Sequence, residues 1–213
     1  SQDTVFYSRD TEKLKDLFFE FVRDNIKSLI INACGQFRGN YVPANRSNEE
    51  LYYKYGEAEK NNFLATQAER WLKIDDDRKG QVKSFLDTAI RLLKIGDDVE
   101  IDDTSGLGII NIYVKKNGRK FYLAEEGFGI RQVLSIILES AITSAENFDI
   151  DASNLGPAYG GDPSSPYLIV IEEPETNLHP TNQAKLMDLL LLANKAFNLR
   201  FIIETHSEYM IRR

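Results

Sequence analysis

Acidic and histidine side chains follow two apolar runs near the end of the sequence. Residues 167–171 read Tyr-Leu-Ile-Val-Ile and lead directly into Glu172 and Glu173, and residues 201–203 read Phe-Ile-Ile and are soon followed by His206. Apolar, β-branched runs of this length are typical of buried parallel strands, and parallel sheets bind ligands at the carboxyl ends of their strands. The pattern predicts that these side chains share one sheet edge, which suits nucleotide hydrolysis.

Hydrolysis of ATP needs groups that these residues can provide. Mg²⁺ is usually held by one or two carboxylates, and Glu172, the first residue past the apolar run, is placed for this role. Glu173 projects to another side and is suited to be the general base that activates water. His206 is suited to donate to the γ-phosphate or to the water. The alternative is that these acids form an ordinary solvated strand end.

Composition narrows the class of protein. The 213 residues suffice for one substantial core, and the formal net charge of −7 gives no overall attraction to nucleic acid or to an anionic membrane. No apolar run approaches the roughly 20 residues that span a bilayer. The one cysteine, Cys34, cannot form an internal disulfide, which favours a reducing compartment. We therefore expect a cytoplasmic protein with no membrane partner.

Helical periodicity dominates the first part of the chain. Apolar residues recur at helical spacing over residues 11–31, 48–72 and 82–93, and Gly96 is expected to cap the third helix. The period then changes, and strands are expected at 99–101, 109–115 and 120–123. Asn117-Gly118 between the last two strands is typical of a type I′ hairpin turn.

Two glycines precede a long apolar helix. Gly127 and Gly129 flank Phe128, and apolar positions then continue at helical spacing as far as Ala141. Glycines before a helix let its N–H groups approach an anion closely, and the helix dipole favours that anion. This pattern alone is weak evidence. Residues 153–166 are rich in Gly, Pro, Ser and Asp and predict a surface loop or a disordered connector.

The motifs together resemble those of one family. Residues 172–180, Glu-Glu-Pro-Glu-Thr-Asn-Leu-His-Pro, resemble the Walker B and D-loop segment of ABC-type AAA family ATPases, in the branch that contains the SMC, RecF and OLD-family heads. Residues 201–207 resemble the H-loop of that branch, and residues 123–134 resemble its signature motif. Two of these matches, in order and correctly separated, make the resemblance specific. It implies that ATP and Mg²⁺ bind between two heads that dimerise.

The resemblance implies a role for each candidate site residue. Glu172 would bind the metal, and Glu173 and His206 would be catalytic. The residues expected to contact ATP or the partner head are Gly127, Phe128, Gly129, Arg131, Gln132 and His179. Many relatives carry a small serine where this chain has Arg131. Two interpretations of Arg131 are open: an arginine finger that acts in trans on the γ-phosphate, or an exposed helix residue.

Another short element bears on the same family. Residues 41–46 contain Pro43 and Arg46, and they resemble a Pro-x-x-Arg-like element that precedes the helical lobe in OLD-type ATPases. The sequence contains no Gly-x-x-x-x-Gly-Lys-Ser/Thr phosphate loop, so the chain is expected to be the C-terminal part of an ATPase head.

The predicted fold class is α/β, with an ABC-ATPase-head-like parallel sheet edge and a helical plus β-hairpin lobe, in a partial domain. The expected boundaries are 1–123 for the helical lobe with its hairpin, 124–147 for the signature motif and helix, 148–166 for a flexible loop, and 167–213 for the Walker B, D-loop, crossover helix and H-loop.

The main functional hypothesis is an ATPase subunit that dimerises head-to-head and controls an effector, such as a nuclease, or DNA or RNA, in bacterial anti-phage defence. Alternatives are a DNA repair or recombination ATPase, a non-hydrolysing scaffold, and a metal-dependent nuclease that uses Glu172, Glu173, His179 and His206 directly. Two weaker patterns suggest nucleic-acid contacts. Tyr52, Tyr53 and Tyr55 could form a stacking platform, and the basic residues that flank the hairpin turn are Lys115, Lys116, Arg119 and Lys120. Ordinary packing and a solvated hairpin are the preferred interpretations of these two.

Overall fold

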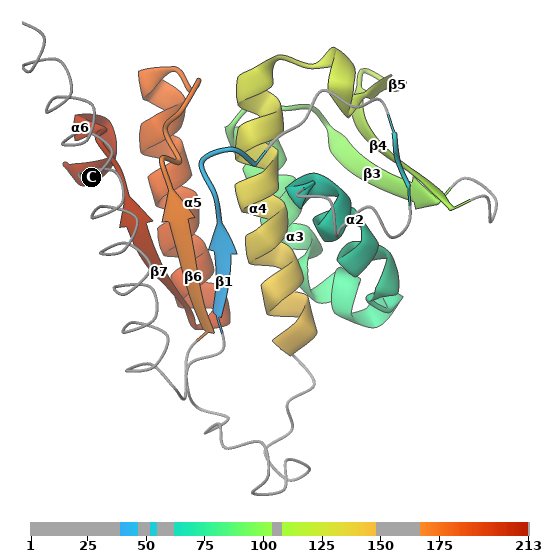
Figure 1. The fold of residues 1–213 in the computed structure, drawn as a ribbon, viewed down its shortest axis with the longest axis horizontal. Coiled ribbons are helices and arrows are strands. Elements are labelled where there is room, and N and C mark those ends of the chain that lie inside the picture. The colour runs from blue at the N-terminus through green and yellow to red at the C-terminus, as the bar shows by residue number, and fades with distance from the viewer. Residues whose placement is uncertain (1–38, 47–51, 55–61, 104–107, 148–166, 213) are drawn as a thin grey trace, which may run out of the picture. The chain divides into compact units, whose positions relative to one another are not determined.

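A three-stranded parallel sheet carries the acidic strand ends in the computed structural model of the protein (Figure 1). The strand order is β1 (Gly39–Val42), β6 (Tyr167–Glu172) and β7 (Leu199–Glu204), with β6 parallel to both neighbours. All three strands therefore end at the same edge. The structure describes residues 39–46, 52–54, 62–103, 108–147 and 167–212.

Helix α5 (Pro180–Phe197) connects β6 to β7. The His179 side chain caps its start, Pro180 occupies the first turn, and Asn198 ends it with a left-handed backbone (φ of 53°). Its buried residues are Leu186, Leu189, Leu190 and Ala193. The short helix α6 (Glu208–Ile211) follows β7. The strand–helix–strand unit predicted from the sequence is thus confirmed.

A second sheet is antiparallel. Its order is β2 (Tyr53–Lys54), β4 (Ile109–Lys116) and β3 (Asp98–Asp103), and β5 (Arg119–Tyr122) also pairs with β4. The turn between β4 and β5 has φ of 51° at Asn117 and 73° at Gly118, the positive values that a type I′ turn requires. The predicted hairpin is therefore confirmed. It continues into a short 3₁₀ helix, η2 (Leu123–Glu125).

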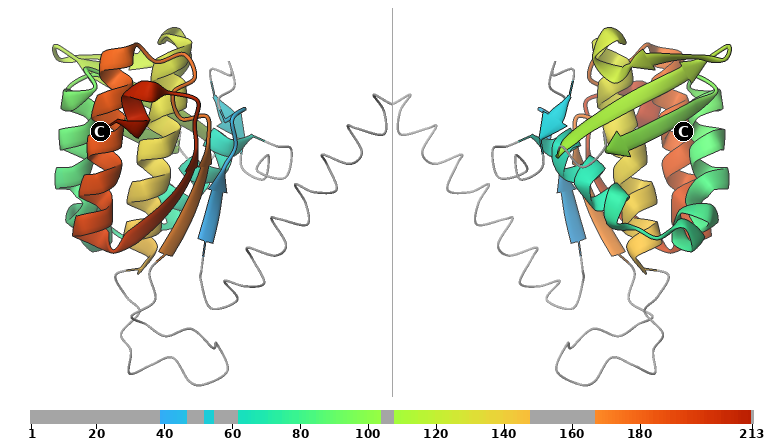
Figure 2. Two further views of the ribbon diagram at one scale, coloured as in Figure 1. Left: turned by 90° about the vertical axis from the view of Figure 1, so that its left-hand side faces the viewer. Right: turned by 90° about the vertical axis from the view of Figure 1, so that its right-hand side faces the viewer.

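Helix α4 (Phe128–Asn147) is central to the packing. It contacts α2 (Phe63–Lys73) and α3 (Asp76–Leu92), and also β1, β6 and α5. Helices α4 and α5 cover one face of the parallel sheet (Figure 2). Because α4 has neighbours on most sides, it is buried along nearly its whole length, and its buried residues include polar ones such as Gln132 and Glu139.

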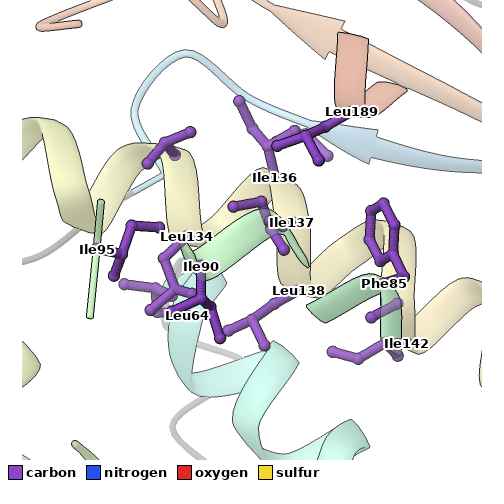
Figure 3. Packing of buried hydrophobic residues seen from close by; sticks show 14 of the residues in the cluster. Leu64, Phe85, Ile90, Ile95, Leu134, Ile136, Ile137, Leu138, Ile142 and Leu189 are labelled. Atoms are coloured by element: carbon purple, nitrogen blue, oxygen red, sulfur yellow. The ribbon is translucent and has the colours of Figure 1, made fainter. Parts of the chain in front are cut away.

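The side chains of α4 are shared between two parts of the core. In Figure 3, Ile136 points toward Leu189 of α5, whereas Leu134 and Leu138 point toward the side of α2 and α3. These side chains are all at most 2% exposed. Burial of one such aliphatic side chain stabilises a fold by about 1.5–3 kcal/mol. Helix α4 therefore stabilises both the packing against α5 and the packing against α2 and α3.

A buried polar cluster lies among these apolar contacts. Glu139 on α4 is fully buried, and its Oε1 accepts hydrogen bonds from Asn40 of β1 at 2.7 Å, from Arg70 of α2 at 2.7 Å and from Thr143 at 3.1 Å. Its Oε2 accepts from Gln67 at 3.0 Å. One carboxylate thus joins β1, α2 and α4.

The charge of this cluster is balanced by Arg70. Burial lowers the pKa of Arg70, but its hydrogen bonds to Glu146 and the nearby charge of Glu139 more than offset this and raise the pKa above its usual value. Arg70 therefore stays cationic, as a buried carboxylate needs.

The structure corrects two expectations for the helical part. Residues 48–72 do not form one helix: Tyr53 and Lys54 form β2, paired with β4, and α2 starts only at Phe63, where the Asn62 side chain accepts a hydrogen bond from the Ala65 N–H. Pairing with a distant strand overrides the helical spacing, since Tyr53 is buried by it.

Gly96 does not cap α3. The helix ends at Leu92 with Leu93 as its C-cap residue, and Lys94 takes the left-handed conformation with φ of 58°. A Cβ on Gly96 would lie 2.6 Å from the carbonyl oxygen of Lys115, so glycine is needed there for close approach to β4. The helix expected at 11–31 and the loop expected at 153–166 fall outside the described residues.

Replacing Glu139 with alanine should destabilise the fold strongly. The change leaves the buried donors of Asn40, Gln67 and Arg70 without their shared acceptor, and breaking a buried ion pair in this way costs roughly 3–5 kcal/mol. Urea denaturation measures the loss. The control is Glu146→Ala, which removes a 39% exposed partner of the same arginine and should cost less than about 1 kcal/mol. Equal losses for the two variants would contradict a structural role for the buried cluster.

Candidate functional site

The two predicted acidic strand ends lie side by side. Glu172 is the last residue of β6 and is paired in register with Glu204, the last residue of β7. The next residue, Glu173, donates its N–H to the Glu204 carbonyl at 2.9 Å. The ladder therefore extends one bond beyond the strand, and it brings Glu172 and Glu173 to the carboxyl edge of the sheet.

Glu173 has an unusual backbone conformation. Its φ is 42°, in the left-handed region, which costs a non-glycine residue roughly 1–2 kcal/mol. Thr176 stabilises the turn that follows: its N–H donates to the Glu173 carbonyl and its hydroxyl donates to the Glu173 carboxylate, both at 3.1 Å. The carboxylate is half-buried and held at the strand end. Strained residues of this kind cluster at functional sites.

Arg46 holds the same turn from the side of β1. It is 1% exposed, and its Nη1 donates to the Glu172 carbonyl at 2.8 Å and to the Pro43 carbonyl at 3.1 Å. Its Nη2 donates to the Glu173 carbonyl at 3.1 Å, and its Nε donates to the Gln132 carbonyl of α4 at 3.1 Å. The Pro-x-x-Arg-like element had marked this arginine, but sequence reasoning gave it no place in the site.

Burial lowers the pKa of Arg46 to about 10, although the carboxylates of Glu175, Glu173 and Glu172 each raise it. The remaining value is still well above neutrality, so Arg46 carries a positive charge under ordinary conditions. The strand end therefore contains one buried cation surrounded by three acids.

Glu175 links the loop after β6 to the segment after β7. Its Oε1 accepts from the His206 N–H at 2.6 Å, and its Oε2 accepts from the Thr205 hydroxyl at 2.7 Å. These bonds fix the backbone of His206, whose side chain is exposed at the edge. Glu175 belongs to the site by these contacts, and its position inside the motif at 172–180 was the signal that could have identified it.

The glycines before α4 approach the loop after β6. A Cβ on Gly129 would overlap the carbonyl oxygen of Asn177, whereas a Cβ on Gly127 would meet nothing within 4 Å. A cavity of about 240 Å³ lies here, lined among others by Gly127, Gly129, Asn177 and His179. His179 is exposed, and its Nδ1 accepts from the Thr181 N–H at 3.3 Å. The structure thus brings His179 and the two glycines together.

The remaining candidates lie in the first turns of α4. Arg131 is only 6% exposed: its Nη1 donates to the Ala124 carbonyl at 3.1 Å, and its guanidinium lies 5.4 Å from the centre of the Phe128 ring. The interpretation of Arg131 as an exposed helix residue is therefore wrong. Phe128 itself is 37% exposed. Gln132 is buried, and its amide donates to the Ala44 carbonyl at 3.4 Å.

The acids suit a metal site whose remaining ligands come from phosphates and water better than a metal site made by protein side chains alone. The described ranges contain no group of three or more His, Cys, Asp or Glu side chains that could hold a metal ion. Mg²⁺ needs only one or two carboxylates when phosphates and water complete its shell. The Glu172 carboxylate is half-buried and accepts a long hydrogen bond, 3.4 Å, from the Ala44 N–H, so it fits that role.

The structure bears unequally on the two patterns that suggested nucleic-acid contacts. Tyr53 is 2% exposed and cannot offer a ring face for stacking, whereas Tyr52 is 48% exposed and Tyr55 lies outside the described residues. In the hairpin, Lys115 and Lys120 both bind Glu100 at 2.6 Å, and Lys116 binds Glu126 at 2.6 Å. The charge of these lysines is thus largely compensated within the protein, as expected for a solvated hairpin.

Replacing Gly129 with alanine should disturb the contact between α4 and the loop after β6. The added methyl group overlaps the Asn177 carbonyl, and overpacking of this kind costs typically 1–3 kcal/mol. Gly127→Ala is the control, since its methyl group would enter open space and should change stability by less than about 0.5 kcal/mol. Thermal denaturation of both variants gives the comparison. A Gly129→Ala variant as stable as Gly127→Ala would contradict the close approach.

Comparison with solved structures found partial overlaps. Two solved structures overlap with part of the chain, each at 13% identity. One comes from work on ATP-driven dimerization and DNA-stimulated activation of SMC ATPases (TM-score 0.42, 63% of this chain and 76% of that one). The other is the Smc head domain with an extended coiled coil bound to the C-terminal domain of ScpA, derived from Pyrococcus furiosus (TM-score 0.41, 62% of this chain and 29% of that one).

The comparison with curated proteins gave no significant match. Among the described residues, no helix has the length and apolar character needed to cross a membrane. The model of the AAA ATPase domain family matches residues 8–211, nearly the whole sequence. The chain therefore belongs to the AAA ATPase domain family.

Proposed function

We propose that this chain forms the Walker B, D-loop and H-loop part of an ATP-hydrolysing head of the ABC type. The observation that carries the proposal is the strand end itself: Glu172 ends the central strand, Glu173 follows it, and the Glu173 N–H is bonded to the neighbouring strand that leads to His206. Parallel sheets bind nucleotides at this edge. Membership of an ATPase family supports the same chemistry.

The residues at the edge have distinct roles in this proposal. Glu172 binds Mg²⁺, which would neutralise phosphate charge when bound with ATP. Glu173 accepts a proton from the attacking water, and its half-buried carboxylate is steadied by the Thr176 hydroxyl for that purpose. His206 donates from its exposed ring to the γ-phosphate or the water, while Glu175 fixes its backbone.

The phosphate loop is supplied by a polypeptide segment outside this sequence. The 213 residues contain no Gly-x-x-x-x-Gly-Lys-Ser/Thr motif, and ATP hydrolysis of this type needs the backbone cradle and lysine of that motif. The alternative, a non-hydrolysing scaffold, is favoured by the same observation. A test of turnover separates the two.

Two heads close on each other with ATP between them. The cavity beside Gly127, Gly129 and His179 supports a contact with the partner head, because glycines at a helix start allow close approach of an anion. Phe128 and Gln132 flank that surface. Arg131 remains a candidate arginine finger, and to act in trans its guanidinium must leave the Ala124 carbonyl.

The finer assignment to the OLD, RecF and SMC-like branch comes from the motifs. On that basis the head controls an effector such as a nuclease, or DNA or RNA, in anti-phage defence, and a DNA repair or recombination ATPase is the runner-up. A nuclease that acts directly through Glu172, Glu173, His179 and His206 is disfavoured, because the described residues do not gather these side chains into a metal-binding group.

Replacing Glu173 with glutamine should abolish turnover and leave ATP binding intact. A general base contributes about 10²–10⁴-fold to the rate, and glutamine keeps the size but not the basicity of the side chain. The measurements are ATP turnover and ATP-dependent dimerisation by size-exclusion chromatography, on the protein together with the segment that carries the phosphate loop. Persistence of an ATP-bound dimer is expected.

The matched control is Glu146→Gln, which makes the same chemical change at the far end of α4 and should keep wild-type turnover. Normal turnover in Glu173→Gln would refute the catalytic assignment. Absence of turnover in the wild-type protein with the phosphate-loop segment present would favour the scaffold.

A further inference from the structure

Arg46 bonds to two consecutive carbonyl groups of the chain. In a regular strand successive carbonyls point to opposite sides, so one side chain cannot bond to both. The positive φ of Glu173 turns the chain so that the carbonyls of Glu172 and Glu173 face the same guanidinium, at 2.8 and 3.1 Å. The two hydrogen bonds of Arg46 therefore depend on the left-handed conformation of Glu173.

The same guanidinium is tied to α4. Its Nε donates to the backbone carbonyl of Gln132. The side-chain amide of Gln132 donates in return to the Ala44 carbonyl, in the loop that carries Arg46. The two bonds run in opposite directions between the loop and the helix. A movement of the start of α4 would thus act on the guanidinium, and through it on the Glu172-Glu173 turn.

We propose that Arg46 is a positioning residue that locks the Glu173 carboxylate in place according to the position of α4. This inference rests on the proposed function, in which Glu173 is the general base and the start of α4 faces the partner head. Arg46 touches neither ATP nor water in this account. A change in the position of α4 moves the Arg46 guanidinium, which in turn moves the strand end through the carbonyls of Glu172 and Glu173.

Only an arginine can make this set of contacts. Its planar fork donates from Nε, Nη1 and Nη2 in fixed directions, whereas a lysine ammonium is a point charge on a flexible stem. Arg46→Lys therefore keeps a positive charge beside Glu172, Glu173 and Glu175 and loses the geometry. A purely electrostatic role would survive this change, and a positioning role would not.

The first test is amide hydrogen exchange, which does not depend on ATP hydrolysis. In Arg46→Lys, the amides of Glu173 and Thr176 should exchange at least tenfold faster than in the wild type, because the turn that they close is no longer held. Amides of α3 should exchange at the wild-type rate. Unchanged exchange at Glu173 and Thr176 would overturn the inference.

The second test is the split between kcat and KM in the same protein with its phosphate-loop segment. Misplacement of a catalytic group by about 1 Å costs on the order of 10²-fold in rate, so kcat should fall between tenfold and a hundredfold while KM for ATP stays within twofold. A wild-type kcat in Arg46→Lys would overturn the inference. If the wild-type protein does not hydrolyse ATP, the proposed function fails and the exchange test still decides the role of Arg46.

Two further variants complete the design. Arg70→Lys is the matched control: it makes the same change at another arginine, which is 24% exposed and has carboxylate partners, and it should lower stability without changing exchange at Glu173. If Arg46→Lys does not fold, Gln132→Met removes only the side-chain bond to the Ala44 carbonyl and should speed exchange at Glu173 by a smaller factor. Equal exchange in Gln132→Met and the wild type would then count against coupling through α4.

Discussion

The arrangement of the strand ends depends on the buried guanidinium of Arg46. A cation at 1% exposure is costly unless its donors are matched, and here carbonyls from the β1 loop, from β6 and from α4 match them. Three acids around it raise its pKa against the effect of burial. Because a single rigid group donates all these hydrogen bonds, the three segments that meet at the sheet edge are held in one relative position.

Helix α4 gives this arrangement its support. Gln132 and Glu139 stand about two helical turns apart, so both face the segment that contains Asn40 and Arg46. At Gln132 the contact is the hydrogen bond from the Arg46 guanidinium, and at Glu139 it is the hydrogen bond from Asn40 to the carboxylate. The β1 segment is thus attached to α4 at both ends, and the same helix packs against α2 and α3. A motion within this domain must therefore move α4 and the strand ends together.

The sequence predicted the elements whose patterns are local. The apolar runs before Glu172 and His206 correctly indicated parallel strands, and Asn117-Gly118 correctly indicated the hairpin, because the positive φ values of that turn select these residue types. The error at β2 has a non-local cause: Tyr53 is held by pairing with Ile110, which no spacing near residue 53 reveals.

The candidate site was predicted only where its residues belong to local patterns. Its acids and histidine stand inside short motifs, so their neighbourhood at the sheet edge followed from the order of the strands. The contact of Arg46 with Glu172 and Glu173 joins segments that are far apart in the sequence, and the positive φ of Glu173 has no marker in its residue type. The burial of Arg131 likewise depends on the turn before α4, to which it bonds.

In the proposed function, the ends of β6 and β7 lie beside the metal that is bound with ATP. The most direct test replaces Mg²⁺ with Fe²⁺ in the protein with its phosphate-loop segment and uses ascorbate and peroxide to generate radicals that cut the nearby backbone. We expect cuts at residues 43–46, 172–173 and 205–206 that require ATP. Cuts at these positions without ATP, or ATP-dependent cuts only elsewhere, would refute this placement of the metal.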